Sequence, residues 1–88
     1  MAPALAKFIA TRALKVPSAT YSVKDLLADF LAMLPPAARQ DWPRSRLIAE
    51  LTASGFAVGI DPRARTYAVA GIAPKAALES VDGRLVAN

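Results

Sequence analysis

The fold is decided by the stretch Trp42–Ile72, WPRSRLIAELTASGFAVGIDPRARTYAVAGI. Its first part has apolar residues at helical spacing, namely Leu47, Ile48 and Leu51. Gly55 comes just after, and glycine often occupies the left-handed position that ends a helix. Residues 56–60 and 66–72 then alternate apolar and small side chains, a pattern typical of half-buried strands. The stretch therefore predicts a helix that runs directly into a β-hairpin.

The alternation also predicts which side chains of the hairpin share a face. One set is Phe56, Val58 and Ile60 on the first strand, with Tyr67, Val69 and Gly71 on the second. Asp61-Pro62 opens the turn between the strands. Arg63 and Arg65 follow in the loop, and alternation would place both on the same side of an extended segment.

Two further helices are predicted before this stretch. The first covers residues 3–14, where the apolar stripe consists of Leu5, Phe8, Ile9 and Ala13. The second begins after Ser22, which heads an acidic capping box with Asp25, and Pro35-Pro36 ends it after Leu34. Its apolar face consists of Leu26, Leu27, Phe30, Leu31 and Leu34.

The remaining segments are predicted to connect these elements. Residues 16–19 are expected to form a connector because Pro17 disfavours a helix at Val16, and residues 20–22 a short strand. Residues 35–42 form a turn with one helical turn at 37–40, and the third helix begins near Pro43. Trp42 is expected to anchor the start of that helix. The predicted core consists of Leu27, Phe30, Leu31, Leu47, Leu51, Phe56 and Val69.

Composition excludes several classes of site. The chain has 88 residues, enough for one small domain. It contains no Cys and no His, so disulfides, thiolate zinc sites and histidine bases are excluded, and neither a cofactor nor a metal is expected. Asp25 and Asp29 are spaced one helical turn apart, but no other acid is near them in sequence, so they are interpreted as capping and surface residues. No catalytic motif is present, and the chain is not expected to be an enzyme.

Charge and hydropathy suggest where the chain acts. The net charge is +4, and no acidic residue precedes Asp25. No apolar run approaches the roughly 20 residues of a membrane span, so no membrane partner is expected. Lys7, Arg12 and Lys15 interrupt any signal-peptide core, and a cytoplasmic location is predicted. An organellar transit peptide is the alternative for this basic, acid-free N-terminus.

The predicted order is helix, short strand, helix, turn, helix, strand, loop, strand. This is the order of an α+β winged helix, here placed in residues 1–74, with a weakly structured tail at 75–88 that could include a short helix at 75–80. A winged helix can present one helix to the DNA major groove and its hairpin loop to the flanking backbone.

The candidate DNA-binding residues lie on the third helix and at the hairpin tip. They are Arg44, Ser45, Arg46, Ala49, Arg63 and Arg65. Arginine binds guanine edges and phosphates with two donors, and small side chains allow close approach to the duplex. We expect the helix residues to lie in or near a groove and Arg63 and Arg65 to contact the flanking backbone. The alternative for Arg46 is a surface ion pair with Glu50, four residues along the helix.

From Phe8 to Ile72 the chain resembles the winged-helix domain at the C-terminus of poxvirus and phage primase–helicases, and more distantly the DNA-binding domain of regulatory factor X proteins. The matching positions are Phe8-Ile9, residues 23–27 with Phe30, residues 42–45, Leu51, Gly55-Phe56, Thr66-Tyr67 and residues 69–72. This loop is poorer in arginine than the regulatory factor X pattern. The resemblance implies a DNA-docking part of a replication enzyme if the chain is a fragment, and a small phage or plasmid regulator if it is complete.

Double-stranded DNA is therefore the expected partner. The main alternative is a winged helix that binds protein, docking its third helix or wing on an acidic partner surface. A regulator or inhibitor from a mobile element that acts on a protein is a further alternative. Fold alone does not separate these functions.

Overall fold

The computed structural model describes residues 1–75. Within them the elements, in order, are α1 (Pro3–Arg12), β1 (Ala13–Ser22), α2 (Val23–Ala32), α3 (Pro36–Arg39), α4 (Arg44–Ala53), β2 (Val58–Asp61) and β3 (Thr66–Pro74). The predicted α+β class is confirmed. Apart from Lys75, the predicted C-terminal helix and tail lie outside the described residues.

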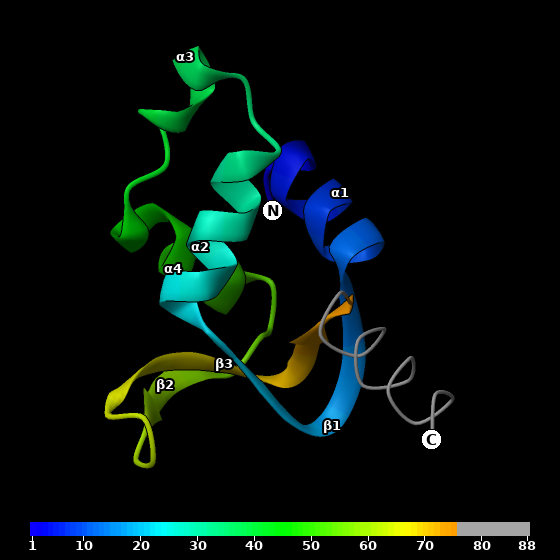
Figure 1. The fold of residues 1–88 in the computed structure, drawn as a ribbon, viewed down its shortest axis with the longest axis vertical. Helices are drawn as coiled ribbons and strands as arrows, with labels where there is room; N and C mark the ends of the chain where they lie inside the picture. Colours follow the sequence, from blue (N-terminus) through cyan, green and yellow to red (C-terminus); the bar gives the residue numbers. More distant parts are fainter. Residues whose placement is uncertain (76–88) are drawn as a thin grey trace, which may run out of the picture.

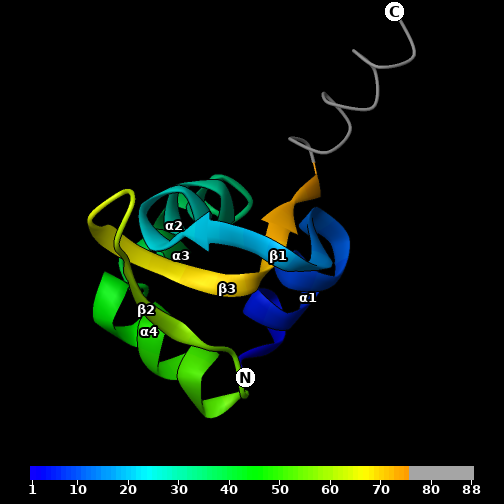
Figure 2. The same cartoon turned by 90° about the horizontal axis from the view of Figure 1, so that it is seen from below.

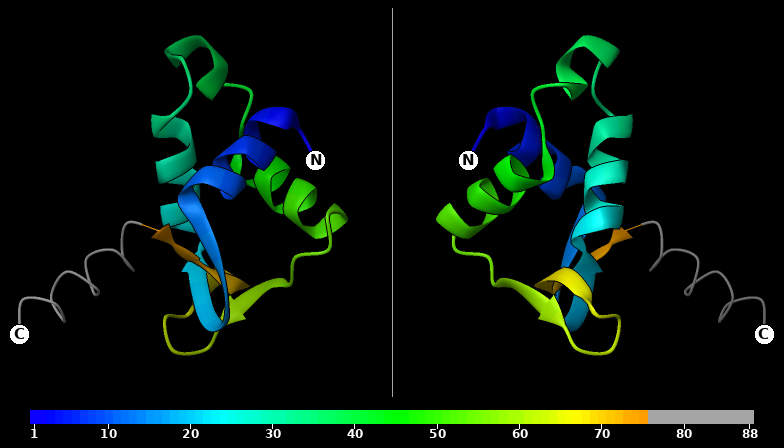
Figure 3. Two further views of the ribbon diagram at one scale, coloured as in Figure 1. Left: turned by 90° about the vertical axis from the view of Figure 1, so that its right-hand side faces the viewer. Right: turned by 90° about the vertical axis from the view of Figure 1, so that its left-hand side faces the viewer.

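The helices lie together on one side of a three-stranded antiparallel sheet (Figure 1). The strand order is β1-β3-β2, so the last strand lies in the middle (Figure 2). The β2–β3 loop and the bend in β1 both extend away from the helices (Figure 3). In this arrangement the sheet supports α4 while leaving the hairpin loop exposed.

The helix boundaries follow from local chemistry. The Ser22 side chain accepts a hydrogen bond from the Asp25 amide at 3.1 Å, as the predicted cap requires, and α2 begins directly after it. At the end of α4, Phe56 N–H donates to Leu51 O and Gly55 N–H donates to Thr52 O, both at 3.1 Å. Gly55 has φ +95°, so these bonds form the Schellman motif that the glycine predicted.

The first and second helices are each shorter than predicted. The first ends at Arg12 rather than Leu14, because the chain already pairs with β3 from Ala13 onward. The second ends at Ala32 rather than Leu34, two residues earlier than the proline pair suggested. Strand pairing and the tight turn before Pro35 end these helices before the apolar periodicity does.

The short strand predicted at 20–22 is present as the last part of a longer strand, whereas the connector predicted at 16–19 lies inside that strand instead of between two elements. Strand β1 runs from Ala13 to Ser22, and its pairing with β3 is interrupted between Lys15 and Thr20. Opposite this break, Gly71 has φ +84°. The break and the glycine together shift the alternation in β3, so Val69 and Ile72 are both buried although they are three residues apart.

The core joins all three long helices to the sheet. Phe30 packs between Phe8, with ring centroids 5.5 Å apart, and Trp42, at 4.8 Å with the rings nearly perpendicular. Trp42 is therefore the anchor that was predicted. The large side chains below 2% exposure are Leu5, Phe8, Val23, Leu26, Phe30, Leu47, Leu51, Val69 and Ile72.

The predicted core was partly right. Phe30, Leu47, Leu51 and Val69 are buried, whereas Leu27, Leu31 and Phe56 are half-buried at its edge. The structure also buries residues outside that set, namely Leu5, Phe8, Tyr21, Val23, Leu26, Trp42, Ile72 and the small residues Ala13, Ala68 and Ala73. The three alanines are buried where β1 and β3 pair, and periodicity alone does not reveal this pairing.

Candidate nucleic-acid interface

Helix α4 shows its small side chains to solvent. Leu47 and Leu51 are buried, so the opposite face carries Ser45, Ala49 and Ala53, all of them exposed. The helix starts after Pro43 without a side-chain cap, and its first turn contains no acidic residue. This face can be approached closely by another molecule, and the positive end of the helix dipole is not neutralised by an acid in its own first turn.

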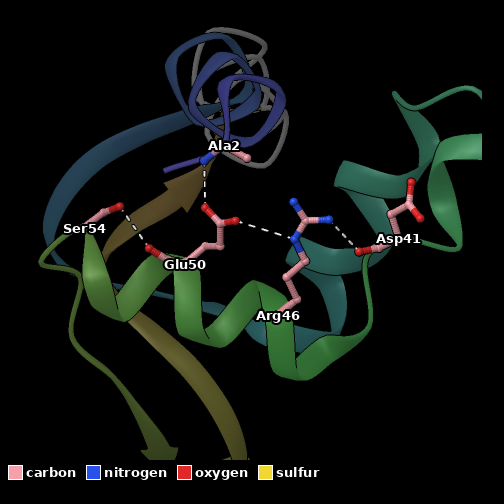
Figure 4. A network of polar contacts seen from close by, with 5 residues as sticks. All are labelled: Ala2, Asp41, Arg46, Glu50 and Ser54. Carbon is pink, nitrogen blue, oxygen red and sulfur yellow. Dashed lines mark hydrogen bonds and ion pairs between the residues drawn. The ribbon is translucent and has the colours of Figure 1, made fainter.

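Arg46 is held by several neighbours (Figure 4). Its guanidinium lies 4.0 Å from the centre of the Trp42 ring, and its Nε is 3.5 Å from Oε2 of Glu50. Its Nη1 donates to the backbone oxygen of Asp41 at 2.8 Å. The Glu50 pair that the sequence offered as the alternative is therefore present. Arg46 fixes the start of α4 against the preceding loop, although 42% of its side chain remains exposed.

Glu50 extends this network to the N-terminal helix. Its Oε1 accepts a hydrogen bond from the Ala2 amide at 2.7 Å (Figure 4). Ala2 directly precedes α1, so the carboxylate joins the beginning of α1 to the middle of α4. One acidic side chain thus positions two helices and neutralises Arg46.

Arg44 points to the other side of α4, toward the hairpin. Its guanidinium carbon lies 5.3 Å from the centre of the Tyr67 ring, a cation–π distance. Tyr67 is near the beginning of β3 and is directly opposite Ile60 of β2. The first turn of α4 and the part of the hairpin next to its tip therefore form one continuous surface.

The hairpin tip is a compact turn, so the predicted extended loop was wrong. The Asp61 side chain accepts from the Arg63 amide at 2.9 Å, and its backbone oxygen accepts from the Arg65 amide at 2.7 Å. Arg65 has φ +54°, in the left-handed region. Alternation consequently says nothing about the direction of the two arginine side chains. Both are exposed, and within residues 1–75 neither forms a side-chain hydrogen bond or ion pair.

The exposed apolar pair Ile60–Tyr67, next to the hairpin tip, was not predicted from the sequence. Ile60 was expected to share the buried face with Val58, but 65% of it is exposed. It does share that face, because the pair Val58–Val69 is followed by the pair Ile60–Tyr67 on the same side. Tyr67 is also 37% exposed, so the hairpin reaches beyond the helices that cover Val58 and Val69. The exposed length of a hairpin cannot be read from its alternation.

Arg39 precedes the candidate arginines in the sequence, and in the structure it binds the end of α2. Its Nε donates to the carbonyl oxygens of Leu31 at 2.9 Å and Leu34 at 3.2 Å. These groups lie at the C-terminal end of α2, where a cation is favoured by the helix dipole. The nearby basic side chains left without a polar side-chain contact in the described part of the chain are Arg44, Arg63 and Arg65.

A second polar feature lies away from α4. The Tyr21 hydroxyl donates to Oδ2 of Asp29 beside an open hollow of about 440 Å³ between α1, α2 and the end of β3. Burial raises the pKa of Tyr21 above its usual value, and the hydrogen bond to Asp29 and the nearby negative charge raise this pKa further. Asp29 thus bonds a tyrosine, and residues 1–75 contain no cluster of three or more metal-ligating side chains.

Within the same residues, no helix has both the length and the apolar character needed to cross a membrane. Comparison of the chain with models of known protein families, with curated proteins and with solved structures gave no match.

Proposed function

We propose that this chain is a winged-helix domain that binds double-stranded DNA through α4 and the β2–β3 hairpin. The proposal is supported by the element order and by the sheet order β1-β3-β2, with the hairpin directly after α4. In this scheme α3 is an added helical turn between the second and third long helices. A role in phage or plasmid regulation, or as the DNA-docking part of a replication enzyme, is proposed from the sequence resemblance.

The observation that carries the proposal is the contact between Arg44 and Tyr67. It places the small exposed face of α4 and the two arginines of the hairpin tip on adjoining parts of the molecule. In the proposed complex, Ser45 and Ala49 face the groove, Arg44 contacts a phosphate beside it, and Arg63 and Arg65 contact the flanking backbone. Arg46 orients α4 through its contacts with Trp42 and Glu50, and the exposed part of its side chain faces the duplex.

Salt dependence tests this proposal. Each phosphate contact contributes about 0.9 to the slope of log affinity against log salt concentration. We expect the double variant Arg63→Ala, Arg65→Asn to make the slope shallower by about 1.8. Asparagine is chosen at 65 because it tolerates the left-handed backbone there. Lys7→Ala removes one charge from α1, and as the matched control it should leave the slope unchanged.

The measurement is fluorescence anisotropy of a labelled duplex with the parent and the variants at several salt concentrations. Absence of duplex binding at low salt, or a slope near zero, would contradict the proposal and favour an acidic protein partner. A shallower slope in Lys7→Ala with no change in the hairpin variant would move the contact surface to the basic first helix.

A further inference from the structure

We infer that the exposed pair Ile60–Tyr67, together with Arg44, binds an unpaired base of the nucleic acid. This inference rests on the proposed function and specifies the form of its ligand. Among the described residues of the hairpin, Ile60 and Tyr67 are the large apolar side chains that are exposed to solvent. These two residues and Arg44 are called the notch below.

The notch is formed by the regular geometry of the hairpin. Ile60 and Tyr67 are directly opposed across β2 and β3, and they continue the face whose next pair, Val58 and Val69, packs against the core. They are 65% and 37% exposed. An aliphatic and an aromatic side chain at such a position form an apolar surface, and its removal from water by a ligand is favourable.

The electrostatic surroundings of the notch favour a polyanion. Arg44 lies over the Tyr67 ring, and Arg63 and Arg65 follow Ile60 at the hairpin tip. The carboxylate of the acid nearest in sequence, Asp61, accepts a hydrogen bond from the Arg63 amide of that tip. A ligand for this surface therefore needs an apolar face close to negative charge.

An unpaired nucleotide combines these two properties. In a continuous duplex the faces of each base are covered by its neighbours, so the notch would meet only sugar and phosphate. At a duplex end or in a single strand a base face is open, and aromatic side chains and arginine both stack on bases. The notch adjoins the start of α4, so the unpaired base would lie beside the end of the bound duplex.

The test compares three labelled probes: a blunt duplex, the same duplex with a single-stranded overhang, and oligo(dT). We expect the parent to bind the overhang duplex about 5- to 150-fold more tightly than the blunt one, the range that corresponds to stacking of one base. Ile60→Thr should abolish this preference and change blunt-duplex affinity by less than about twofold. Tyr67→Val should abolish the preference as well, and it should also weaken binding of the blunt duplex, because Arg44 loses the ring that positions it. Both keep a β-branched residue in the strand, so pairing is preserved.

Two control variants separate stacking from general effects. Tyr67→Phe keeps the ring and should keep the preference for the overhang. Leu14→Ala shortens another exposed apolar side chain, 42% exposed on the edge strand β1, and should change nothing. Circular dichroism of each variant confirms that the fold is retained.

The outcomes distinguish the two proposals. Equal affinity of the parent for blunt and overhang duplexes, or equal weakening of both by Tyr67→Val, overturns the inference and leaves duplex binding intact. Binding of oligo(dT) alone, lost in Tyr67→Val, retains the inference while rejecting the duplex proposal. Failure of all three probes, with Tyr67-dependent binding of a peptide of glutamate and leucine, overturns both in favour of a protein partner.

Discussion

Phe30 touches two other aromatic rings, and each comes from a different part of the chain. Because its side chain is 1% exposed, shortening it leaves a cavity between α1, α2 and the segment before α4. We expect Phe30→Ala to lower the free energy of unfolding by about 3–5 kcal/mol. Denaturant titration measures this change. Met33→Ala, just after the same helix at a side chain that is 39% exposed, is the control and should cost less than about 1 kcal/mol. A loss of similar size in both variants would contradict this view of the core.

Tyr21 is expected to make the folded state less stable as the pH becomes alkaline. Its pKa is raised in the folded chain, so the folded state holds the phenolic proton more tightly than the unfolded state does. The resulting stabilisation is fully present below about pH 10, the usual tyrosine pKa, and is lost as pH rises above it. We expect Tyr21→Phe to be less stable than the parent by about 1 kcal/mol at pH 7. The difference should shrink above about pH 10, when measured by urea titration across pH. A constant difference would show that the phenolic proton is not involved.

The structural role of a single residue was predictable from the sequence where one local rule determines that role. The cap at Ser22, the left-handed Gly55 and the anchor Trp42 follow from spacing and residue type. The exposure of Ile60 was not predictable, because it depends on how far neighbouring helices reach over the hairpin. The same limit applies to Arg46, whose partners include an aromatic ring and a carbonyl that only the fold brings near it.

Among the elements, α4 depends most on how it ends. Gly55 has φ +95°, and a Cβ added at this position would meet no atom within 4 Å, so a side chain there is opposed by backbone strain rather than by crowding. We expect Gly55→Ala to destabilise the chain by about 1–2 kcal/mol. Gly55→Asn should cost less, because asparagine tolerates this conformation better. Thermal denaturation of the two variants checks the order. If alanine and asparagine are equally tolerated, the Schellman end is not important for stability.

The elements were predicted correctly wherever one periodicity ran without interruption. Helix α4 and the hairpin up to Val69 satisfy this condition, whereas α2 ends two residues early and the alternation of β3 shifts at Gly71. Strand β1 did not, because Pro17 and the small residues around it resemble a connector, and only pairing with β3 draws both flanks into one strand. A strand that is held by a distant partner carries little local signal.

At the scale of the whole molecule, one charged network joins α1, α4 and the loop before it. Arg46 and Glu50 connect these parts through Trp42, Asp41 and Ala2. We expect Arg46→Ala to lower stability by about 1–2 kcal/mol and to weaken all duplexes similarly, because the orientation of α4 changes. Thermal denaturation and binding to a selected and a scrambled duplex measure both effects. Ser45 is not part of this network, so Ser45→Ala, as the control, should change the free energy of unfolding by less than about 0.5 kcal/mol. Weakening of the selected duplex alone, in a fully stable Arg46→Ala, would instead indicate a base contact.

At this scale the order of the elements was predictable from the sequence, but which charged side chains remain free to bind a ligand was not. Of the five arginines between residues 39 and 65, only Arg46 had a recognisable partner in the sequence, Glu50 four residues along the helix. In the structure Arg39 holds the end of α2 and Arg46 holds the start of α4, which leaves Arg44 and the two tip arginines for a ligand. Which cations are already engaged depends on contacts between segments, and composition does not contain that information.

The interrupted pairing of β1 affects how copies of this chain meet at high concentration. As an outer strand of the sheet, β1 offers its free backbone groups to any passing strand, the usual route to fibrils. The pairing of β1 with β3 breaks between Lys15 and Thr20, and the backbone nitrogen of Pro17 has no hydrogen to donate, so this edge is irregular in its middle. We expect an edge interrupted in this way to recruit a neighbouring strand less readily than a regular one. The irregularity that disguised this strand in the sequence is thus expected also to oppose association of copies through β1.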